Sequence, residues 1–461
     1  MTGKRILLQR EVGRRSRASL KELQNAFAPW LNLTCLGKST RDCLLTWPRV
    51  FLLFLSQVLS ADGSCREAVQ KFLAWLALEE GRQASPNTAA YCKSRARLPM
   101  EKMEQLHKDM VNVIQDSYRD QGTWHERPVK VVDGSGLSMP DTLENQQVFP
   151  QSKRAAPGCG FPQMRITALF SLATGVLLKC CWASRYVSER AMFRLLWESL
   201  VPGDIVLADR GFCGFVEFFL LLQRGGGFRY APAFATQCWS ADHQEMRSWR
   251  HVGPMDKNEA LPHGVYQGTM GRDPFGPGCT AHLICSRSAR ISESEHHYRH
   301  YPYRLQAIPA AAFAELYRRR WSIELYFRDI KISMGMDVLR CLTPKMVQKE
   351  VMMYIIAYNL IRATMLEASQ ATQRVAERIS FKDTCQALRE WTPIFAIVIT
   401  EEAKVLYRAM LQAIGSAPLP HRPDRSEPRA RKRRPKNYQL LNKPRHQFKE
   451  IPHRGKYVKQ P

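Results

Sequence analysis

The stretch PVKVVDGSG, residues 128–136, is the most informative about the fold, because it joins an apolar run to an acidic turn. The valines at 129, 131 and 132 predict a β-strand, and Asp133-Gly134 predicts that the strand ends there. A loop, GSGLSMPDT, is expected to follow. A carboxylate at the end of a buried strand lies at the rim of a sheet, where the ligands of open sheets bind.

Beyond this stretch, the next hundred residues alternate between strand-like and helix-like patterns. The turn Thr174-Gly175 predicts a hairpin, and Ser188 is a suitable N-cap for a helix. The predicted elements are strands at 165–172 and 176–182, a helix at 188–200, a strand at 204–208, a helix at 214–223 and a strand at 228–231. This order predicts a mixed α/β domain.

Asp209 repeats the arrangement of Asp133, since it ends the apolar run DIVLA and precedes Arg210-Gly211. Either aspartate alone is typical of a turn or a helix cap. Two such residues in one sheet favour a shared site.

A third acid, Glu324, lies on a predicted helix with cations and aromatic residues. At about 100° per residue, Tyr317, Arg320, Glu324 and Lys331 fall within a wedge of roughly 60°. A solvated face with i, i+4 ion pairs would give the same pattern. The aromatic rings of Tyr317 and Trp321 between cations instead suit a nucleic-acid strand, with cations on phosphates and rings on bases. Three carboxylates from two strands and a helix are the ligands that a two-metal phosphoryl-transfer site requires, with Mg²⁺ or Mn²⁺.

Composition agrees with a polyanionic partner. The 461 residues carry 68 Lys and Arg against 42 Asp and Glu, a net charge of +26. Hydrophobic residues at 45% are enough for a large core and exclude a disordered chain. No apolar run approaches the roughly 20 residues of a membrane span, and no signal peptide is recognisable, so we expect a cytoplasmic, nucleoid-associated protein without membrane contact.

The first 125 residues are expected to be helical, with helices at 16–28, 64–80 and 88–97. Two helices joined by a short turn, the second one basic, resemble a helix-turn-helix. Arg95 and Arg97 are therefore candidate DNA contacts, with an ordinary helical hairpin as the alternative.

The remaining segments are a β-rich insertion at 236–310 and helices around 347–366 and 401–414. Residues 421–461 hold 14 Lys or Arg against 3 acids. Within this tail Arg431, Lys432, Arg433 and Arg434 are candidate phosphate contacts, unless the tail is only solvated.

Three strings carry a resemblance to a known family. They are VVDGSGLSMPDT (131–142), GDIVLADRGFCGF (203–215) and YRRRWSIELYFRDIK (317–331). The third fits the signature Tyr-x2-Arg-x3-Glu-x6-Lys at every position. Together they resemble the signature blocks of DDE transposases of the bacterial insertion-sequence-four family.

The resemblance implies a ribonuclease H-like catalytic core and assigns roles to residues. It makes Asp133, Asp209 and Glu324 the catalytic, metal-binding triad, with two Mg²⁺ or Mn²⁺ ions. It makes Tyr317, Arg320 and Lys331 contacts to the phosphates of the element end, with Arg210 also in the second block. Candidates for stacking on a flipped base are Trp321, Tyr298, Tyr301 and Trp239.

The resemblance also implies an organisation and an activity. The expected segments are a DNA-end-binding domain (1–125), the core (126–235), the insertion (236–310), the catalytic helix (311–340), a helical domain (341–418) and a basic tail (419–461). The expected protein binds double-stranded DNA as a homodimer, cleaves the ends of its insertion sequence and joins them to target DNA, through a hairpin intermediate. The alternatives are a two-metal nuclease that does not join ends, and a DNA-binding repressor derived from a transposase.

Overall fold

The computed structural model describes residues 27–37, 44–79, 81–119, 121–201, 203–212, 233–236, 283–284, 310–395, 400–419 and 441–448. The predicted helices at 16–28 and 214–223, the strand at 228–231, most of the β-rich insertion and the cluster Arg431–Arg434 lie wholly or largely outside these ranges.

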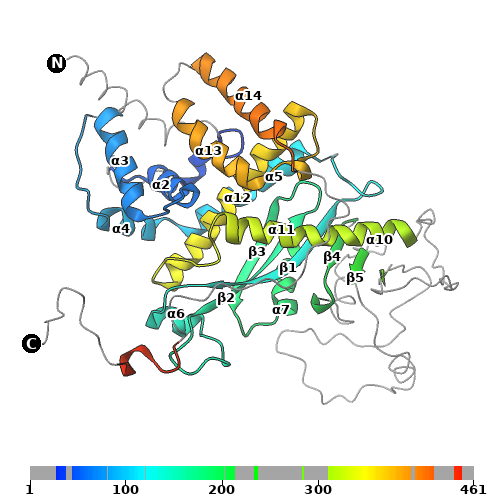
Figure 1. Cartoon of the computed structure of the whole chain (residues 1–461), viewed down its shortest axis with the longest axis horizontal. Helices are drawn as coiled ribbons and strands as arrows, with labels where there is room; N and C mark the ends of the chain where they lie inside the picture. The colour runs from blue at the N-terminus through cyan, green and yellow to red at the C-terminus, as the bar shows by residue number, and fades with distance from the viewer. Residues whose placement is uncertain are drawn as a thin grey trace, which may run out of the picture.

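The described strands form one six-stranded sheet in the order β3-β2-β1-β4-β5-β6 (Figure 1). Strands β1, β2 and β3 are antiparallel, whereas β4, β5 and β6 continue the sheet in parallel to β1. The strands are β1 (Val129–Ser138), β2 (Gln163–Ser171), β3 (Leu177–Ser184), β4 (Ile205–Ala208), β5 (Ala233–Thr236) and β6 (Leu283–Ile284). The predicted hairpin is confirmed, with Gly175 in its turn at φ +68°.

Strand β1 is longer than predicted. It does not end at Asp133 but runs on to Ser138, because β2 pairs with it antiparallel as far as Ser138 opposite Gln163. The predicted loop at 134–138 is therefore wrong. The parallel neighbour β4 pairs only as far as Leu207 opposite Val131. Asp133 thus lies where β1 loses its neighbour on that side, and the rim predicted at this point exists although the strand continues.

The two faces of the sheet are covered by different elements. The odd-numbered residues Val129, Val131 and Leu137 pack into the main core, whereas Val132 packs into a smaller cluster with Phe193 of helix α7 (Glu189–Arg194). This alternation is the strand period of two. Helices α10 (Ala310–Arg318) and α11 (Ser322–Arg328) cross one side, and α7 lies on the other (Figure 1). Ser188 caps α7 as predicted, accepting a hydrogen bond from the Ala191 N–H, but α7 is shorter than expected.

Helix α12 (Pro344–Thr372) is the centre of the main core. It is long and apolar enough to cross a membrane, but 94% of its apolar window is buried inside the protein, and it is the one such helix within the described residues. A buried core helix meets the same criterion.

The other helices pack on α12 either directly or through a neighbouring helix (Figure 1). They are α2 (Trp47–Leu59), α3 (Cys65–Glu79), α4 (Ala89–Arg97), α5 (Met100–Ser117), α6 (Leu143–Val148), α13 (Phe381–Phe395) and α14 (Thr400–Ser416). The predicted helices at 64–80 and 88–97 are confirmed as α3 and α4. The nine residues 80–88 separate them, which is longer than the short turn that a helix-turn-helix needs.

Candidate active site

Asp133 is a half-buried carboxylate on the sheet face that α11 crosses. Its Oδ1 accepts a hydrogen bond from the Gly134 N–H at 2.7 Å. Burial, and to a lesser extent the nearby carboxylate of Asp209, raise the pKa of Asp133 to about 6, against the lowering effects of the Gly134 bond and Arg320. The charged form of Asp133 is therefore disfavoured unless a cation approaches.

Asp209 follows β4 directly, and its Oδ1 accepts a hydrogen bond from the Gly211 N–H at 2.9 Å. In β4, Ile205 and Leu207 point into the main core and Val206 and Ala208 into the α7 cluster. The same alternation directs Asp209 to the face of Asp133. The fold thus brings the two predicted aspartates together at one rim.

The helix that carries the third acid is not a regular α-helix. Between α10 and α11 lies a 3-10 turn, Arg319–Trp321, and α11 continues into a π-helical turn, Asp329–Ser333. The predicted wedge at 100° per residue is therefore not one solvated stripe. Tyr317 and Arg320 are buried at 7% exposure, whereas Trp321 is 59% exposed.

Arg320 connects this helix to the rim. Its Nη1 lies 4.0 Å from Oδ2 of Asp133, and its guanidinium lies 5.1 Å from the ring of Trp321 and 5.8 Å from that of Tyr317. Its Nε is buried and has no hydrogen-bond partner among the described residues. Such a donor is available to an acceptor brought by a ligand.

Lys331 reaches the same strand from the π-helical turn, where its Nζ donates to Oγ of Ser135 at 3.0 Å. Burial lowers the pKa of Lys331. Asp133 and Ser135 are alternate residues of one strand and share a face. Two cations eleven positions apart in the sequence therefore converge on about 7 Å of strand.

Glu324 is exposed on α11, between Arg320 and Lys331 in the sequence. Among the side chains that the structure describes, no group of three or more His, Cys, Asp or Glu residues is placed to hold a metal ion. The fold thus brings Asp133 and Asp209 together and does not bring Glu324 into a closed group of three with them. Carboxylate oxygens are the donors that Mg²⁺ and Mn²⁺ prefer, so the two aspartates fit such an ion by their chemistry.

The predicted DNA contacts on α4 differ from each other. Arg95 is buried, donates to Oε1 of Gln57 at 2.9 Å and lies 4.7 Å from the ring of Phe54. Its guanidinium holds helices together and does not face solvent, contrary to the prediction of a DNA contact. Arg97 is exposed, as a DNA contact must be.

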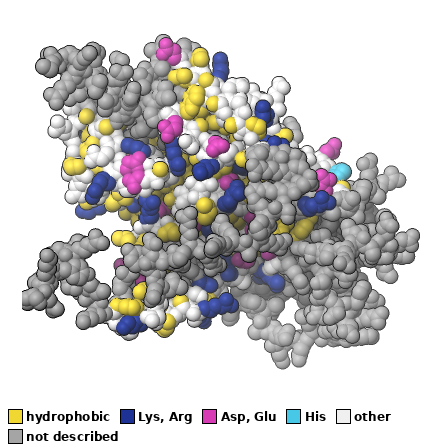
Figure 2. Space-filling model, in the orientation of Figure 1, with side chains coloured by type: hydrophobic (Ala, Val, Ile, Leu, Met, Phe, Trp, Pro, Cys, Tyr) yellow, Lys and Arg dark blue, Asp and Glu magenta, His cyan; other side chains and the backbone are white. Residues whose placement is uncertain are grey.

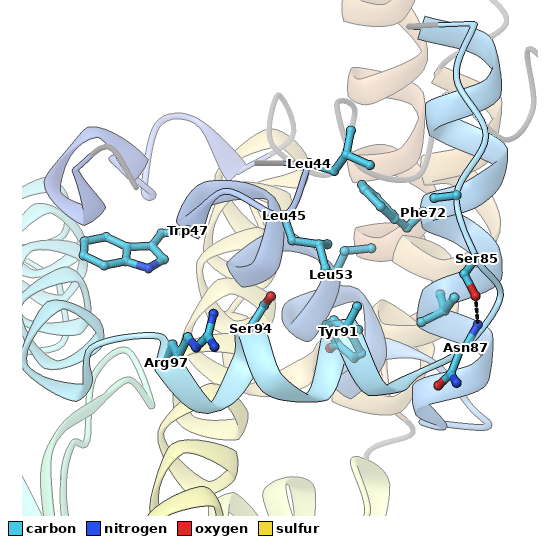
Figure 3. Close-up of a pocket in the computed structure, with 13 residues that line it drawn as sticks. Leu44, Leu45, Trp47, Leu53, Phe72, Ser85, Asn87, Tyr91, Ser94 and Arg97 are labelled. Atoms are coloured by element: carbon cyan, nitrogen blue, oxygen red, sulfur yellow. Dashed lines mark hydrogen bonds between the residues drawn. The ribbon is translucent and has the colours of Figure 1, made fainter. Parts of the chain in front are cut away.

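Arg97 also lies beside a hollow of about 610 Å³ in the helical region. Figure 3 shows Arg97 and Ser94 on α4 below the segment that carries Leu45 and Trp47. Arg210 begins a short 3-10 helix, Arg210–Phe212, directly after Asp209. Figure 2 shows lysine and arginine side chains dispersed over the visible described surface.

A second group of residues at the rim was not predicted from the sequence. A hollow of about 360 Å³ lies against Gly134, Ser135 and Gly136 and is lined by Arg165, Arg185 and Glu189 among others. Glu189 also acts on the pKa of Asp133. The pairing of Gly136 with Arg165 across β1 and β2 creates this proximity, and no local pattern signals it.

Comparisons with known proteins agree with the signature blocks. The profile of the family described as "Transposase DDE domain" matches residues 124–360, just over half of the chain. The transposase InsG for insertion sequence element IS4 of Escherichia coli K12 is 24% identical over 321 residues, which cover 68% of this chain and 70% of the relative. A cryo-EM structure of a piggyBac transposase synaptic complex with hairpin DNA has a TM-score of 0.39 and 11% identity, over 90% of this chain and 86% of that one. On the family match and the IS4 relative, the chain belongs to the DDE transposases of the IS4 type.

Proposed function

We propose that this transposase cleaves the ends of its insertion sequence and joins them to target DNA at the rim that carries Asp133 and Asp209, with Glu324 as the third catalytic carboxylate. The observation that carries the proposal is the raised pKa of Asp133 to about 6 beside Asp209, with Arg320 of the catalytic helix 4.0 Å away. Two carboxylates that repel each other in a half-buried site are stabilised by a divalent cation, which is the cofactor that such chemistry uses.

The sheet order supports a ribonuclease H-like core. An antiparallel trio, β3-β2-β1, is continued by parallel strands, and both aspartates lie where the short parallel strand β4 ends. Within the proposed organisation, residues 126–235 and the catalytic helix at 311–340 form this core. The segments 1–125, 236–310, 341–418 and 419–461 are the end-binding domain, the insertion, the helical domain and the basic tail.

Asp133, Asp209 and Glu324 would hold one or two Mg²⁺ or Mn²⁺ ions. Such ions activate a water or hydroxyl and stabilise the leaving oxygen in an in-line displacement. Glu324 lies between Arg320 and Lys331 in the sequence, four residues after the first and seven before the second. Arg320 and Lys331 flank Glu324 in the sequence and both reach β1, so a shift of α11 toward the sheet would bring Glu324 to the aspartates. We infer that DNA binding produces this shift.

Arg320, Tyr317 and Lys331 would hold the phosphates of the element end. The buried Nε of Arg320 supplies a donor that has no partner in the described part of the chain. The exposed ring of Trp321 is available to stack on a base. Arg97, Arg210 and the cluster Arg431–Arg434 would add contacts to the backbone of double-stranded DNA, which a homodimer would bring together as two ends.

The reaction repeats one substitution with different nucleophiles. Water first attacks the phosphate at the element end and releases a 3′ hydroxyl. This hydroxyl attacks the opposite strand to give a hairpin, which water opens again. The 3′ hydroxyl then attacks a target phosphate and displaces its 3′ oxygen, which joins the two DNAs.

A strand-transfer assay tests the proposal. Duplexes with the element's terminal repeats, intact or already cleaved, are incubated with target plasmid and Mg²⁺. We expect joined product from the wild-type chain, and cleavage at least about a hundredfold slower from Glu324→Gln, since one metal ligand is removed. End binding in EDTA should be retained by this variant.

Glu315→Gln is the matched control, because Glu315 is an exposed glutamate on the neighbouring helix α10. It should cleave like the wild type. Cleavage without joined product would favour the nuclease, and binding without cleavage the repressor. Cleavage by Glu324→Gln at the wild-type rate would contradict the proposed triad.

A further inference from the structure

The hollow beside Asp133 lies on the opposite face of β1 from the catalytic helix. Asp133 and Ser135 point toward the face of Arg320 and Lys331. Gly134 and Gly136 alternate with them and therefore point toward the α7 face, where the hollow lies. A chain that passes over the rim at Asp133 would contact α11 on one side and this hollow on the other.

Two arginines line the hollow. Arg165 stands opposite Gly136 in the pairing of β1 with β2, and its Nη1 donates to the Val187 carbonyl at 2.8 Å. Its Nε lies 3.5 Å from Oε1 of Glu189, which is long for an ion pair. Arg185 donates to Oε1 of Gln163. Each guanidinium has five donors, so both retain donors for a phosphate.

The glycines keep the hollow open. A side chain at 134 would meet Glu189, since an added Cβ would lie 2.7 Å from its Oε1. A Cβ at 136 would meet nothing within 4 Å, although Gly136 is in a regular strand without a positive φ. Glycine inside a strand weakens it and often marks close approach by a ligand. Packing within the protein would therefore allow a side chain at position 136, and does not explain the glycine.

The surface continues from the hollow over the turn after β3. Tyr186 is 46% exposed, and the Lys153 Nζ lies 5.2 Å from its ring. The Lys153 N–H donates to the Tyr186 hydroxyl at 2.9 Å, which fixes the ring. Cations next to an exposed ring are the combination that binds a nucleic-acid strand. We call Lys153, Arg165, Arg185, Tyr186 and the bare Gly136 the flank surface.

We propose that the flank surface binds the DNA that lies beyond the scissile phosphate, on the side away from the element end. This inference rests on the proposed function, which places the element end on the α11 face and the scissile phosphate at Asp133. The strand continues past that phosphate, and the flank surface is a basic surface on the other side of β1 in the part of the chain that the structure describes.

The test compares two fluorescent duplexes that carry the terminal repeat of the element, one ending at the scissile phosphate and one with a flank of about ten base pairs, one helical turn. Binding to the full-length chain is measured by anisotropy in EDTA, so that no cleavage occurs. The wild-type chain should bind the flanked duplex about tenfold more tightly. In the variant Arg165→Gln with Arg185→Gln this ratio should fall below about twofold. The salt slope for the flanked duplex should fall by about 0.9 for each phosphate that the variant no longer neutralises.

Gly136→Val tests the hollow without changing charge. Valine favours a strand and its Cβ has room, so thermal melting should be unchanged or higher, while the flank ratio falls. Arg119→Gln is the control for charge, since Arg119 is an exposed arginine that pairs with Asp116. It should keep the wild-type ratio.

The outcomes separate this inference from the proposed function. If the wild-type chain binds both duplexes and cleaves in Mg²⁺, but the variants keep the tenfold ratio, the flank surface is overturned and the proposed function stands. If the wild-type chain binds neither duplex, both are overturned.

Discussion

The amide of Asn359 in α12 and the carboxylate of Asp133 at the rim are both polar groups withdrawn from water. The fold gives the amide well-placed hydrogen-bond partners and leaves the carboxylate in an unfavourable environment. Asn359 is fully buried, accepts from the Leu177 N–H at 2.9 Å and donates to the Leu177 carbonyl at 2.9 Å. Asp133 has a backbone bond, a second carboxylate that repels it and an arginine at the limit of an ion pair.

The difference shows what each region is for. The register of β2 with β3 shifts between Leu169 and Phe170, and Asn359 pairs with the backbone of Leu177 at this irregularity. Its hydrogen bonds close a defect and stabilise the core. At the rim the unfavourable negative charge is left in place, and a bound cation can relieve it.

The largest effect on stability is expected in the core. Asn359→Leu would leave the buried N–H and carbonyl of Leu177 without their partner, at a cost of about 1 to 3 kcal/mol for each group. We expect a decrease of about 3 to 5 kcal/mol in the free energy of unfolding, measured by urea denaturation. Asn359→Asp, which retains one acceptor, should lose less at low pH. If the free energy of unfolding fell by less than about 1 kcal/mol, the Asn359 amide would not stabilise the core as argued, and its contrast with the Asp133 carboxylate would be lost.

A substitution at the rim should instead increase the free energy of unfolding. Asp133→Asn removes a charge that the fold disfavours, so we expect the metal-free protein to gain about 2 kcal/mol at pH 8. The folded-state pKa of about 6 lies above the ordinary aspartate value of 3.8. The stabilisation from protonating Asp133 is therefore present below pH 3.8 and lost as the pH rises through 6. The advantage of the variant should shrink as the pH falls from 8 to 5, and a constant advantage would contradict this origin.

The smallest expected change in stability comes from a titratable group in the core. His107 of α5 is buried beside the Leu177 carbonyl and Asn359, and burial lowers its pKa to about 4. Its neutral form is favoured in the fold, so stability is lost as the pH falls below 6.5. Between pH 7.5 and 5.5 the wild-type chain should lose about 1.4 kcal/mol more than His107→Gln. Equal losses would show that His107 is not held neutral.

The elements that depend only on residues close in the sequence were predicted correctly. The hairpin at 165–182, the cap at Ser188 and the helices α3 and α4 follow from turn residues and helical periodicity, and the structure confirms them. The end of β1 was wrong because Gly134 and Gly136 are typical of a loop, whereas pairing with β2, thirty residues further along, keeps them in a strand.

The candidate site shows the same limit. The two aspartates were predicted to lie at one rim of the sheet, and the structure places both there. Asp133 lies where β1 loses its pairing with β4, and Asp209 directly follows β4. The burial of Arg95 and Arg320 was not predictable, because each depends on aromatic rings and partners supplied by packing. The roles of the triad and of the DNA contacts remain predictions, which the strand-transfer and duplex-binding experiments address.

The π-helical turn at Asp329–Ser333 sets the angular phase of Lys331. A π turn contains about one residue more than an α-helical turn, so winding the same residues as α-helix would rotate those within and after the turn by up to about 100° relative to Arg320. Arg320, which precedes the turn, would stay opposite Asp133, whereas the ammonium of Lys331 would swing away from Ser135. The contact of Lys331 with β1 therefore depends on the residue count of this one turn, whereas the contact of Arg320 with β1 does not.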